Sequence, residues 1–305
     1  MTGGGVEASI VLLKLSTLQK GHMPSHKLAK ITIDEMDILG YSVAGEESVV
    51  GMPQLDVCFD IGKAPDQVIP INNLLLTHGH MDHAAGIGYY LSHRKFCGQS
   101  TGRVFAPTNL LAPIRQIVDA WGQLDGNTVP VDLIGVKPGD EHRIKGNLYA
   151  RAFAVKHSYG AVGYTIIEKR KKLKPEYTKL KGPQIVELKK QGIEIDYTLE
   201  FPIVSYMGDT SYMDFSKIDY IAKSKILIIE CTFFLDEHRD RADAGKHMHI
   251  DEFAGLIERM ENEHVIVTHL SQRIGVGQAK AILKKTLSKE AHKKTTLLMD
   301  RKWFL

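Results

Sequence analysis

The sequence has few cysteines, no long apolar run and no strong excess of charge, and each shortage excludes a class of protein. Its 305 residues include three cysteines, none of which forms a Cys-x-x-Cys pair. Disulfide frameworks and thiolate zinc sites are therefore not expected, and a reducing, cytoplasmic environment fits best. No apolar run reaches the roughly 18 residues of a membrane-spanning helix, and no basic segment precedes the short apolar run near the N-terminus. We expect neither a membrane span nor a signal peptide.

Charge and composition leave a globular chain with a sizeable core. The 39 basic and 36 acidic residues give a net charge of +3, which is too mild to indicate nucleic-acid binding without a closer look at its distribution. Hydrophobic residues make up 43% of the chain and charged residues 25%. There is no internal repeat and no Gly/Ser-rich linker. We therefore expect one domain over residues 30–305, preceded by an N-terminal extension over residues 1–29.

Short apolar runs rich in valine and isoleucine alternate with helical patterns along this domain. The alternation predicts a mixed α/β fold. The predicted strands are Leu55–Ile61, Leu74–Thr77, Val131–Val136, Leu148–Val155, Val162–Glu168, Ile203–Met207, Ile226–Ile229, Val265–Thr268 and Thr296–Met299. The predicted helices are His83–Phe96, Leu110–Trp121, Asp251–Asn262 and Gly277–Ser288.

One segment between two predicted strands departs from the even charge of the rest. Residues 169–190 contain nine basic and two acidic residues, an excess of seven positive charges against +3 for the whole chain. The segment also contains Pro175 and the pair Gly182-Pro183. We interpret residues 169–192 as a protruding basic arm. Such an arm would neutralise phosphates without reading a base sequence.

Histidines and aspartates concentrate at the ends of predicted strands. The run His78-Gly79-His80-Met81-Asp82-His83 directly follows the strand Leu74–Thr77 and offers four metal ligands within six residues. His157, Asp209 and His269 each follow a later predicted strand. Imidazole and carboxylate ligands suit zinc, with manganese or iron as alternatives. The pattern predicts a metal centre at one edge of the sheet.

This His-x-His-x-Asp-His loop, followed by His, Asp and His, resembles the metallo-β-lactamase superfamily. The resemblance implies an αβ/βα sandwich with two zinc ions. His78, His80 and His157 would hold the first ion and Asp82, His83 and His269 the second, with Asp209 bridging both. A hydroxide held between the metals would be the nucleophile.

Further segments narrow the resemblance to the tRNase Z family, in its short form and closest to the plant-type enzymes. The basic arm lies where that family inserts a flexible arm with a Gly-Pro pair, just before the bridging aspartate. The other segments that resemble the family's motifs are Phe59–Gly62, Ile229–Phe233, Lys246–His249 and Thr268–Ile274. Lys246 departs from the family pattern, which usually has glycine there.

The resemblance implies a zinc-dependent endoribonuclease that cuts precursor tRNA after the discriminator nucleotide and so removes its 3′ trailer. Asp82 would orient the nucleophile or accept its proton, and His247, oriented by Glu230, would protonate the leaving oxygen. His249 is a rival for the role of His247, although it could simply cap the helix that follows. The residues expected to contact tRNA are Lys169, Arg170, Lys171, Lys172, Lys174, Gly182, Pro183 and Arg273.

The family also implies a homodimer, because the arm of one subunit grips the tRNA that the other subunit cleaves. Two other functions remain open. A small-molecule phosphodiesterase or thioesterase of the same fold would keep every metal ligand but would not need the arm. A non-catalytic RNA-binding relative would have lost ligands, whereas all seven are present.

Overall fold

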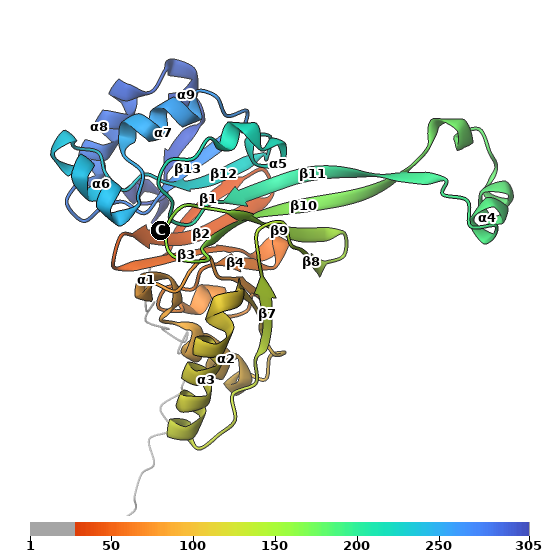
Figure 1. The fold of residues 1–305 in the computed structure, drawn as a ribbon, viewed down its shortest axis with the longest axis horizontal. Helices are drawn as coiled ribbons and strands as arrows, with labels where there is room; N and C mark the ends of the chain where they lie inside the picture. The colour runs from red at the N-terminus through yellow and green to blue at the C-terminus, as the bar shows by residue number, and fades with distance from the viewer. Residues whose placement is uncertain (1–27, 305) are drawn as a thin grey trace, which may run out of the picture.

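Two seven-stranded sheets form the centre of the computed structural model, which describes residues 28–304 (Figure 1). The first sheet follows chain order: β1 (Ala29–Ile33), β2 (Met36–Val43), β3 (Glu47–Met52), β4 (Val57–Phe59), β5 (Asn73–Leu75), β6 (Arg103–Pro107) and β7 (Asp132–Val136). The second contains β8 (Glu141–Lys145), β9 (Leu148–Ala154), β10 (Val162–Leu173), β11 (Asp196–Tyr206), β12 (Ile226–Glu230), β13 (His264–Thr268) and β14 (Thr295–Leu297).

The two sheets repeat one pairing pattern. Strands β1 to β4 and strands β8 to β11 pair antiparallel, and the remaining strands of each sheet pair parallel. Parallel strands end at the same edge of a sheet, so the loops that follow them meet there. This edge is where polar side chains can gather.

Helices cover the outer faces of both sheets, while the inner faces pack on each other. The inner core contains Ile38, Phe59, Val204 and Ile228, all fully buried. The helices beside the first sheet are α1 (Met81–Ala84), α2 (Ile87–Phe96) and α3 (Leu111–Asp125). Those beside the second are α5 (Asp219–Ala222), α6 (Arg239–Gly245), α7 (Ile250–Ile257), α8 (Val276–Thr286) and α9 (Lys289–Lys294). The αβ/βα sandwich expected from the resemblance is confirmed.

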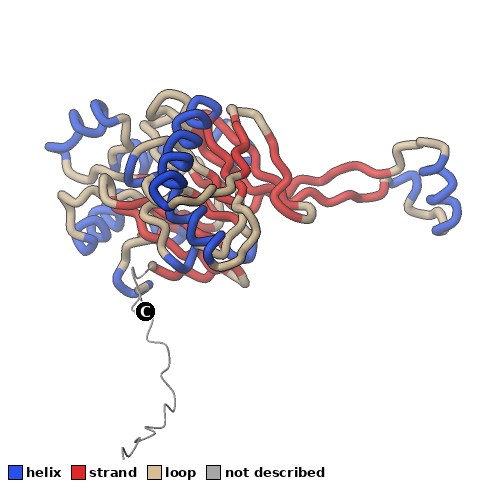
Figure 2. Tube along the Cα trace, turned by 90° about the horizontal axis from the view of Figure 1, so that it is seen from below, coloured by secondary structure: helices blue, strands red, loops and turns tan. Residues whose placement is uncertain are grey.

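The predicted protrusion is confirmed as well. Strand β9 accompanies β10 only as far as Glu168, whereas β11 pairs with it out to Leu173, so the last part of this hairpin leaves the sheet as a two-stranded ribbon. The ribbon ends in a short tip that contains α4 (Gly182–Lys190). Figures 1 and 2 show the ribbon and tip extending far from the rest of the chain.

Most predicted elements are present, with three differences. The predicted helix His83–Phe96 is broken into α1 and α2 at Gly86, where a β-carbon would lie 2.5 Å from the backbone nitrogen of Ala64. Strands β1 to β3, β6 and β8 and helices α4, α5, α6 and α9 were not predicted. Ala29, assigned to the N-terminal extension, is the first residue of β1. Residues 1–27 of the predicted extension lie outside the described residues, so the extension and the domain bounds stay a prediction.

Candidate metal centre

All seven predicted metal ligands lie together at the edge where the parallel strands end. His78, His80, Asp82 and His83 follow β5, and His157 follows β9. Asp209 follows β11 and His269 follows β13. Five of them are almost fully buried, whereas His80 is exposed and Asp82 is partly exposed. The structure therefore places on one site residues that are up to 191 positions apart in the sequence.

Three histidines form the first group. Nδ1 of His80 lies 3.0 Å from Nε2 of His78 and 3.1 Å from Nε2 of His157. Nitrogens bound to a tetrahedral zinc at about 2.0–2.1 Å lie about 3.3 Å from one another, so this spacing fits a shared ion.

Asp82, His83 and His269 form the second group, and Asp209 lies between the two. The Nε2 atoms of His83 and His269 are 3.4 Å apart, and Oδ2 of Asp82 lies within 3.7 Å of both. Oδ2 of Asp209 is 3.2 Å from each of these two nitrogens and 3.7 Å from Nε2 of His78 and of His157. One carboxylate oxygen thus faces both groups, as a bridging ligand must.

The ring nitrogens of four histidines that point away from the centre are occupied by orienting partners. Nδ1 of His78 lies 2.9 Å from Oγ1 of Thr77, and Nδ1 of His269 lies 3.0 Å from Oγ1 of Thr232. Nδ1 of His157 lies 3.1 Å from the carbonyl oxygen of Lys246. Such contacts fix the rings of metal-binding histidines and tune their basicity.

Asp60 is the fourth orienting residue, and sequence reasoning missed this role. Its carboxylate, fully buried, lies 2.8 Å from Nδ1 of His83. It also accepts hydrogen bonds from the backbone and the hydroxyl of Thr77 and from the hydroxyl of Tyr206. Asp60 therefore holds the His78 and His83 segments together. Its position near the end of the first predicted strand was visible, but its partners were not.

Burial and neighbouring charges shift the pKa values of the clustered residues in both directions. Burial opposes a charged His83 ring, but the carboxylates of Asp209 and Asp60 outweigh burial and raise its pKa. Burial alone would raise the pKa of Asp209, but the surrounding histidines, above all His269 and His83, hold it well below its usual range. Burial lowers the pKa of His78, which keeps this imidazole neutral, as a metal ligand must be. The donor set, its spacing and its orienting partners together fit divalent metal ions.

Comparison with known proteins agrees with this geometry. A family model described as a beta-lactamase superfamily domain matches residues 54–270. The chloroplastic tRNase Z TRZ2 of Arabidopsis thaliana is 31% identical over 86% of this chain and 75% of its own length. The tRNase Z TRZ1 of the same plant is 31% identical over 82% of this chain and 90% of its own.

The chain belongs to the tRNase Z family.

The solved structure of the human short-form tRNase Z has the same fold, with a TM-score of 0.52 at 15% identity over 89% of this chain and 93% of that one.

The tRNase Z resemblance assigned Glu230 and His247 to catalysis, and the structure brings them into contact. Oε1 of Glu230 lies 3.0 Å from Nδ1 of His247, and the His247 ring lies against the rings of His157 and His269. Burial opposes a charged imidazole here, but the Glu230 carboxylate outweighs burial and raises the pKa of His247 to about 9. Glu230 thus holds the His247 ring beside the two groups of candidate ligands.

Glu230 itself connects three parts of the site. It is fully buried at the end of β12 and accepts hydrogen bonds from the backbone of Thr210 and Met248 and from the hydroxyl of Thr232. Thr210 adjoins the bridging Asp209, and Thr232 orients His269. His249, the rival of His247, instead caps α7 by accepting a hydrogen bond from the backbone of Asp251.

The departure at Lys246 has a structural counterpart. Lys246 ends α6 with a left-handed backbone (φ 54°), a conformation that glycine adopts without cost and other residues adopt at roughly 1 kcal/mol. Its carbonyl is the partner of His157, so the strained residue helps to orient a predicted ligand.

The cations of the arm, five of which were predicted to contact tRNA, divide into paired and unpaired residues. The returning strand β11 brings acidic residues back along the arm, and residues 169–201 carry nine basic and five acidic residues. Lys169 bonds to Glu141 and Glu200, at the base of the arm. Arg170, Lys171, Lys174 and Lys189 each also lie near a carboxylate. Within the described residues, the arm cations without an ion pair are Lys172, Lys179, Lys181 and Lys190.

The other predicted contacts lie apart from one another. Gly182 and Pro183 begin α4 at the tip of the arm. Arg273 is exposed in the loop after His269, beside Gln272, whose side chain reaches the carbonyl of Ala44. Gly45, the residue after Ala44, donates its backbone N–H to Asp82. The loop that contains Arg273 therefore lies beside the candidate metal centre and forms part of its rim.

Proposed function

We propose that this protein is a metal-dependent endoribonuclease that removes 3′ trailers from precursor tRNA by cutting after the discriminator nucleotide. The observation that carries the proposal is the convergence of seven histidine and aspartate ligands on one edge of the sandwich in a chain of the tRNase Z family. A small-molecule hydrolase of the same fold would need these ligands but would have no use for the arm.

The proposal includes two zinc ions per chain, with manganese or iron as alternatives. His78, His80 and His157 would hold one ion and Asp82, His83 and His269 the other, with Asp209 shared. When bound, such ions polarise the scissile phosphate and activate the attacking water.

Three side chains of the site would handle protons. Asp82 is the most accessible carboxylate of the centre and would orient the attacking water. His247 carries a proton that it can deliver to the leaving 3′ oxygen through Nε2, because Nδ1 is directed to Glu230. Glu230 would keep this imidazole protonated and in place.

The unpaired lysines of the arm would contact RNA phosphates, because no carboxylate competes for them. Lys169 and Arg170 would contribute less, since their charges are already balanced by Glu200 and Glu168. This contact would depend on salt and not on sequence.

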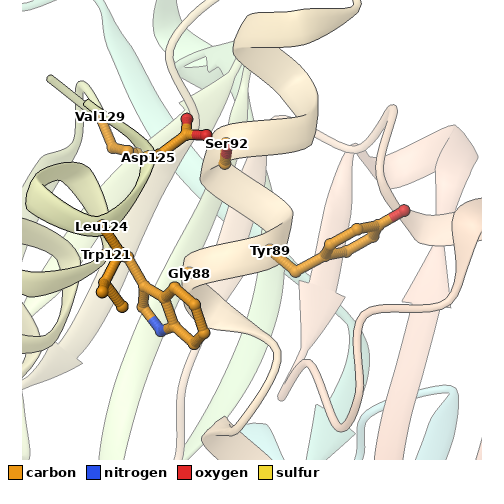
Figure 3. Close-up of a pocket in the computed structure, with 7 residues that line it drawn as sticks. All are labelled: Gly88, Tyr89, Ser92, Trp121, Leu124, Asp125 and Val129. Carbon is orange, nitrogen blue, oxygen red and sulfur yellow. The ribbon is translucent and has the colours of Figure 1, made fainter. Parts of the chain in front are cut away.

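The proposal also includes a homodimer, and the outer face of α1–α3 offers a surface for it. We define this apolar face by six exposed side chains: Met81, Tyr89, Phe96, Ile117, Trp121 and Leu124. Three adjoining cavities line this face, and the one between α2 and α3 is drawn in Figure 3, where Trp121 lies beside Gly88 and the Tyr89 ring points away from it. Exposed apolar patches of this kind mark interaction surfaces. A second copy of the chain would bury it.

Light scattering of the full chain tests the dimer. Phe96 and Leu124 are 86% and 78% exposed, so Phe96→Ser with Leu124→Ser removes apolar contact area without opening the core. We expect a dimer for the unchanged chain and a monomer for the variant. A dimer that survives both substitutions would move the interface elsewhere.

Cleavage of a 3′-extended precursor tRNA, with and without a chelator, tests the proposed activity. We expect a chelator-sensitive cut after the discriminator nucleotide, mapped on a sequencing gel. Turnover of a small phosphodiester without tRNA cleavage would instead favour the small-molecule hydrolase. Metal analysis of the purified chain is expected to give two ions.

The cytoplasmic location expected from the sequence is also part of the proposal. None of the described helices is long and apolar enough to cross a membrane. One of the plant relatives is named as chloroplastic. Fractionation of cells that express the tagged chain distinguishes the cytoplasm from an organelle.

A further inference from the structure

A second strongly basic surface lies on α8, α9 and the chain that follows β14, and the arm does not account for it. Residues 280–302 contain eight basic and two acidic residues, an excess of six, whereas residues 169–201 of the arm have an excess of four. We call this segment the C-terminal basic surface; its cations are Lys280, Lys284, Lys285, Lys289, Lys293, Lys294, Arg301 and Lys302. Figure 1 shows α8 and α9 at the opposite end of the molecule from α4, so the two basic surfaces are separate.

Most of these charges are available to a ligand. Seven of the eight cations are exposed. Lys280 and Lys302 lie near the carboxylate of Asp300, and the carboxylate of Glu258 acts on Lys294. Lys294 donates to the carbonyl of Met260. In the part of the chain that the structure describes, the other five cations form no ion pair. A polyanion binding here would therefore displace few existing contacts.

The surface contains a groove along the edge of the second sheet. A cavity of about 320 Å³ is bounded by Lys280 and Lys284 of α8, by His292 of α9 and by Lys302. All three residues of β14 line it as well, and β14 is the outermost strand of its sheet. An edge strand presents backbone N–H and C=O groups on its open side. In β14 the N–H of Thr295 already donates to His292, and the carbonyl of Leu297 accepts from Asp300 and Trp303. Asp300 also lines the groove, and its carboxylate is paired with Lys280 and Lys302. The groove therefore offers mainly its cations, which suit the backbone of a single-stranded nucleic acid.

The chain connects this groove directly to the rim of the metal centre. His269 is followed by the rim loop with Arg273, and α8 begins at Val276. Lys280 and Lys284 lie one and two turns into α8, so at 1.5 Å per residue they stand about 6 and 12 Å beyond its start. Arg273, Lys280 and Lys284 therefore form a row of cations that leads away from the centre. A single strand that left the scissile bond over this part of the rim would meet these cations, which attract its phosphates.

We propose that the C-terminal basic surface binds the 3′ trailer of the precursor as the trailer leaves the metal centre. This inference rests on the proposed tRNA trailer cleavage and adds a second RNA contact, distinct from that of the arm. The arm would hold the folded body of the substrate, and the C-terminal surface would hold the single strand that is removed. Affinity would then increase with trailer length until the groove is filled.

The test compares two precursors that share one tRNA body and differ in trailer length. One carries a single trailer nucleotide, and the other about sixteen, the upper site size of single-strand-binding folds. The variant Lys284→Gln, Lys293→Gln, Lys302→Gln removes three cations of the surface. The control Lys137→Gln, Lys217→Gln, Lys223→Gln removes the same charge from three exposed lysines elsewhere. Thermal unfolding confirms that both variants fold.

Each phosphate contact in a single strand is worth about fourfold in affinity at about 0.15 M salt, from a slope of about −0.7 per contact. The triple variant is therefore expected to bind the long precursor up to about fiftyfold more weakly, with a salt slope that is less steep by about two. Its cleavage of the short precursor and the behaviour of the control should be unchanged. Equal losses on both precursors would mean that the surface holds the tRNA body, and no loss on either would mean that it holds no RNA. Both results overturn the inference, whereas failure of the unchanged protein to cut either precursor overturns the proposed function instead.

Discussion

Replacement of Asp60 by asparagine tests whether a buried carboxylate outside the ligand set controls metal binding. Asp60 accepts four hydrogen bonds, from the backbone and hydroxyl of Thr77, the hydroxyl of Tyr206 and Nδ1 of His83. Asparagine keeps the size and one acceptor oxygen but turns an NH₂ group towards donors. About two of the four donors would then lose their partner.

The size of the effect follows from these contacts. A buried donor without a partner costs about 1–3 kcal/mol, so two such donors should lower the free energy of unfolding by about 2–6 kcal/mol. In a domain of this size that corresponds to a fall in melting temperature of about 4–12 °C. Loss of an orienting partner of a metal-binding histidine typically weakens metal affinity about 10–100-fold, and His83 should respond in this way.

Thermal unfolding of the metal-free chain and competition with a zinc chelator measure the two effects separately. Tyr206→Phe is the matched control, because it removes one donor to Asp60 and leaves His83 and Thr77 untouched. It should cost about 1 kcal/mol of stability and leave metal affinity unchanged. If Asp60→Asn lowers the melting temperature while zinc affinity stays equal to that of Tyr206→Phe, then Asp60 supports the fold alone and our assignment is wrong.

Four further outcomes are expected. Asp82→Ala should abolish cleavage and leave tRNA binding nearly intact in a gel-shift assay; retained cleavage would remove Asp82 from the mechanism. His247, with its pKa raised to about 9, carries its proton below about pH 9 and loses it as the pH rises further. Glu230→Gln removes the carboxylate that raises this pKa, so the alkaline limb of the kcat/KM profile should move to lower pH, and an unmoved limb would contradict the acid role. Removal of the arm beyond Lys171, with a short turn in its place, should weaken tRNA binding by about tenfold or more while hydrolysis of a small phosphodiester persists; equal loss of both would refute a binding role. Lys246→Gly should raise the free energy of unfolding by roughly 0.5–1 kcal/mol in a denaturant titration, since glycine adopts the left-handed backbone freely, and a loss of stability would show that the lysine side chain matters more than its backbone.

The position of polar residues after strands explains why the clustering of the seven candidate ligands could be predicted from the sequence. Each ligand directly follows an apolar run, and parallel strands carry such positions to one edge. The orienting residues could not be found in this way. Asp60 also follows a strand, but its four donors come from Thr77, His83 and Tyr206, and their meeting depends on how the two sheets pack together.

The arm shows a different limit of sequence reasoning. A window over residues 169–190 gives an excess of seven charges, yet antiparallel pairing places Glu200 opposite Lys169 and Asp196 opposite Leu173. Charge that is local in sequence is therefore partly cancelled in space. Residues 280–302 have almost the same excess in a window of similar length, so the charge of the C-terminal basic surface was also visible in the sequence. What the sequence could not show is that few carboxylates lie close enough to pair with it. Strand β1 was missed for a different reason. Its side chains alternate between buried and exposed, but the strand has five residues and lies at the start of the predicted domain.

The two-stranded ribbon of the arm allows the length of the arm to be changed by design. Because β10 and β11 continue from the second sheet into the ribbon, the length of the arm is set by residue pairs and not by a loose linker. Removing one residue from each strand would shorten the ribbon by about 3.4 Å and turn the side chains beyond the cut to the other face. Removing two from each would shorten it by about 7 Å and restore every side chain to its own face. The distance between the tip and the metal centre can therefore be changed in regular steps. A series of such chains would report the distance that the bound substrate has to span.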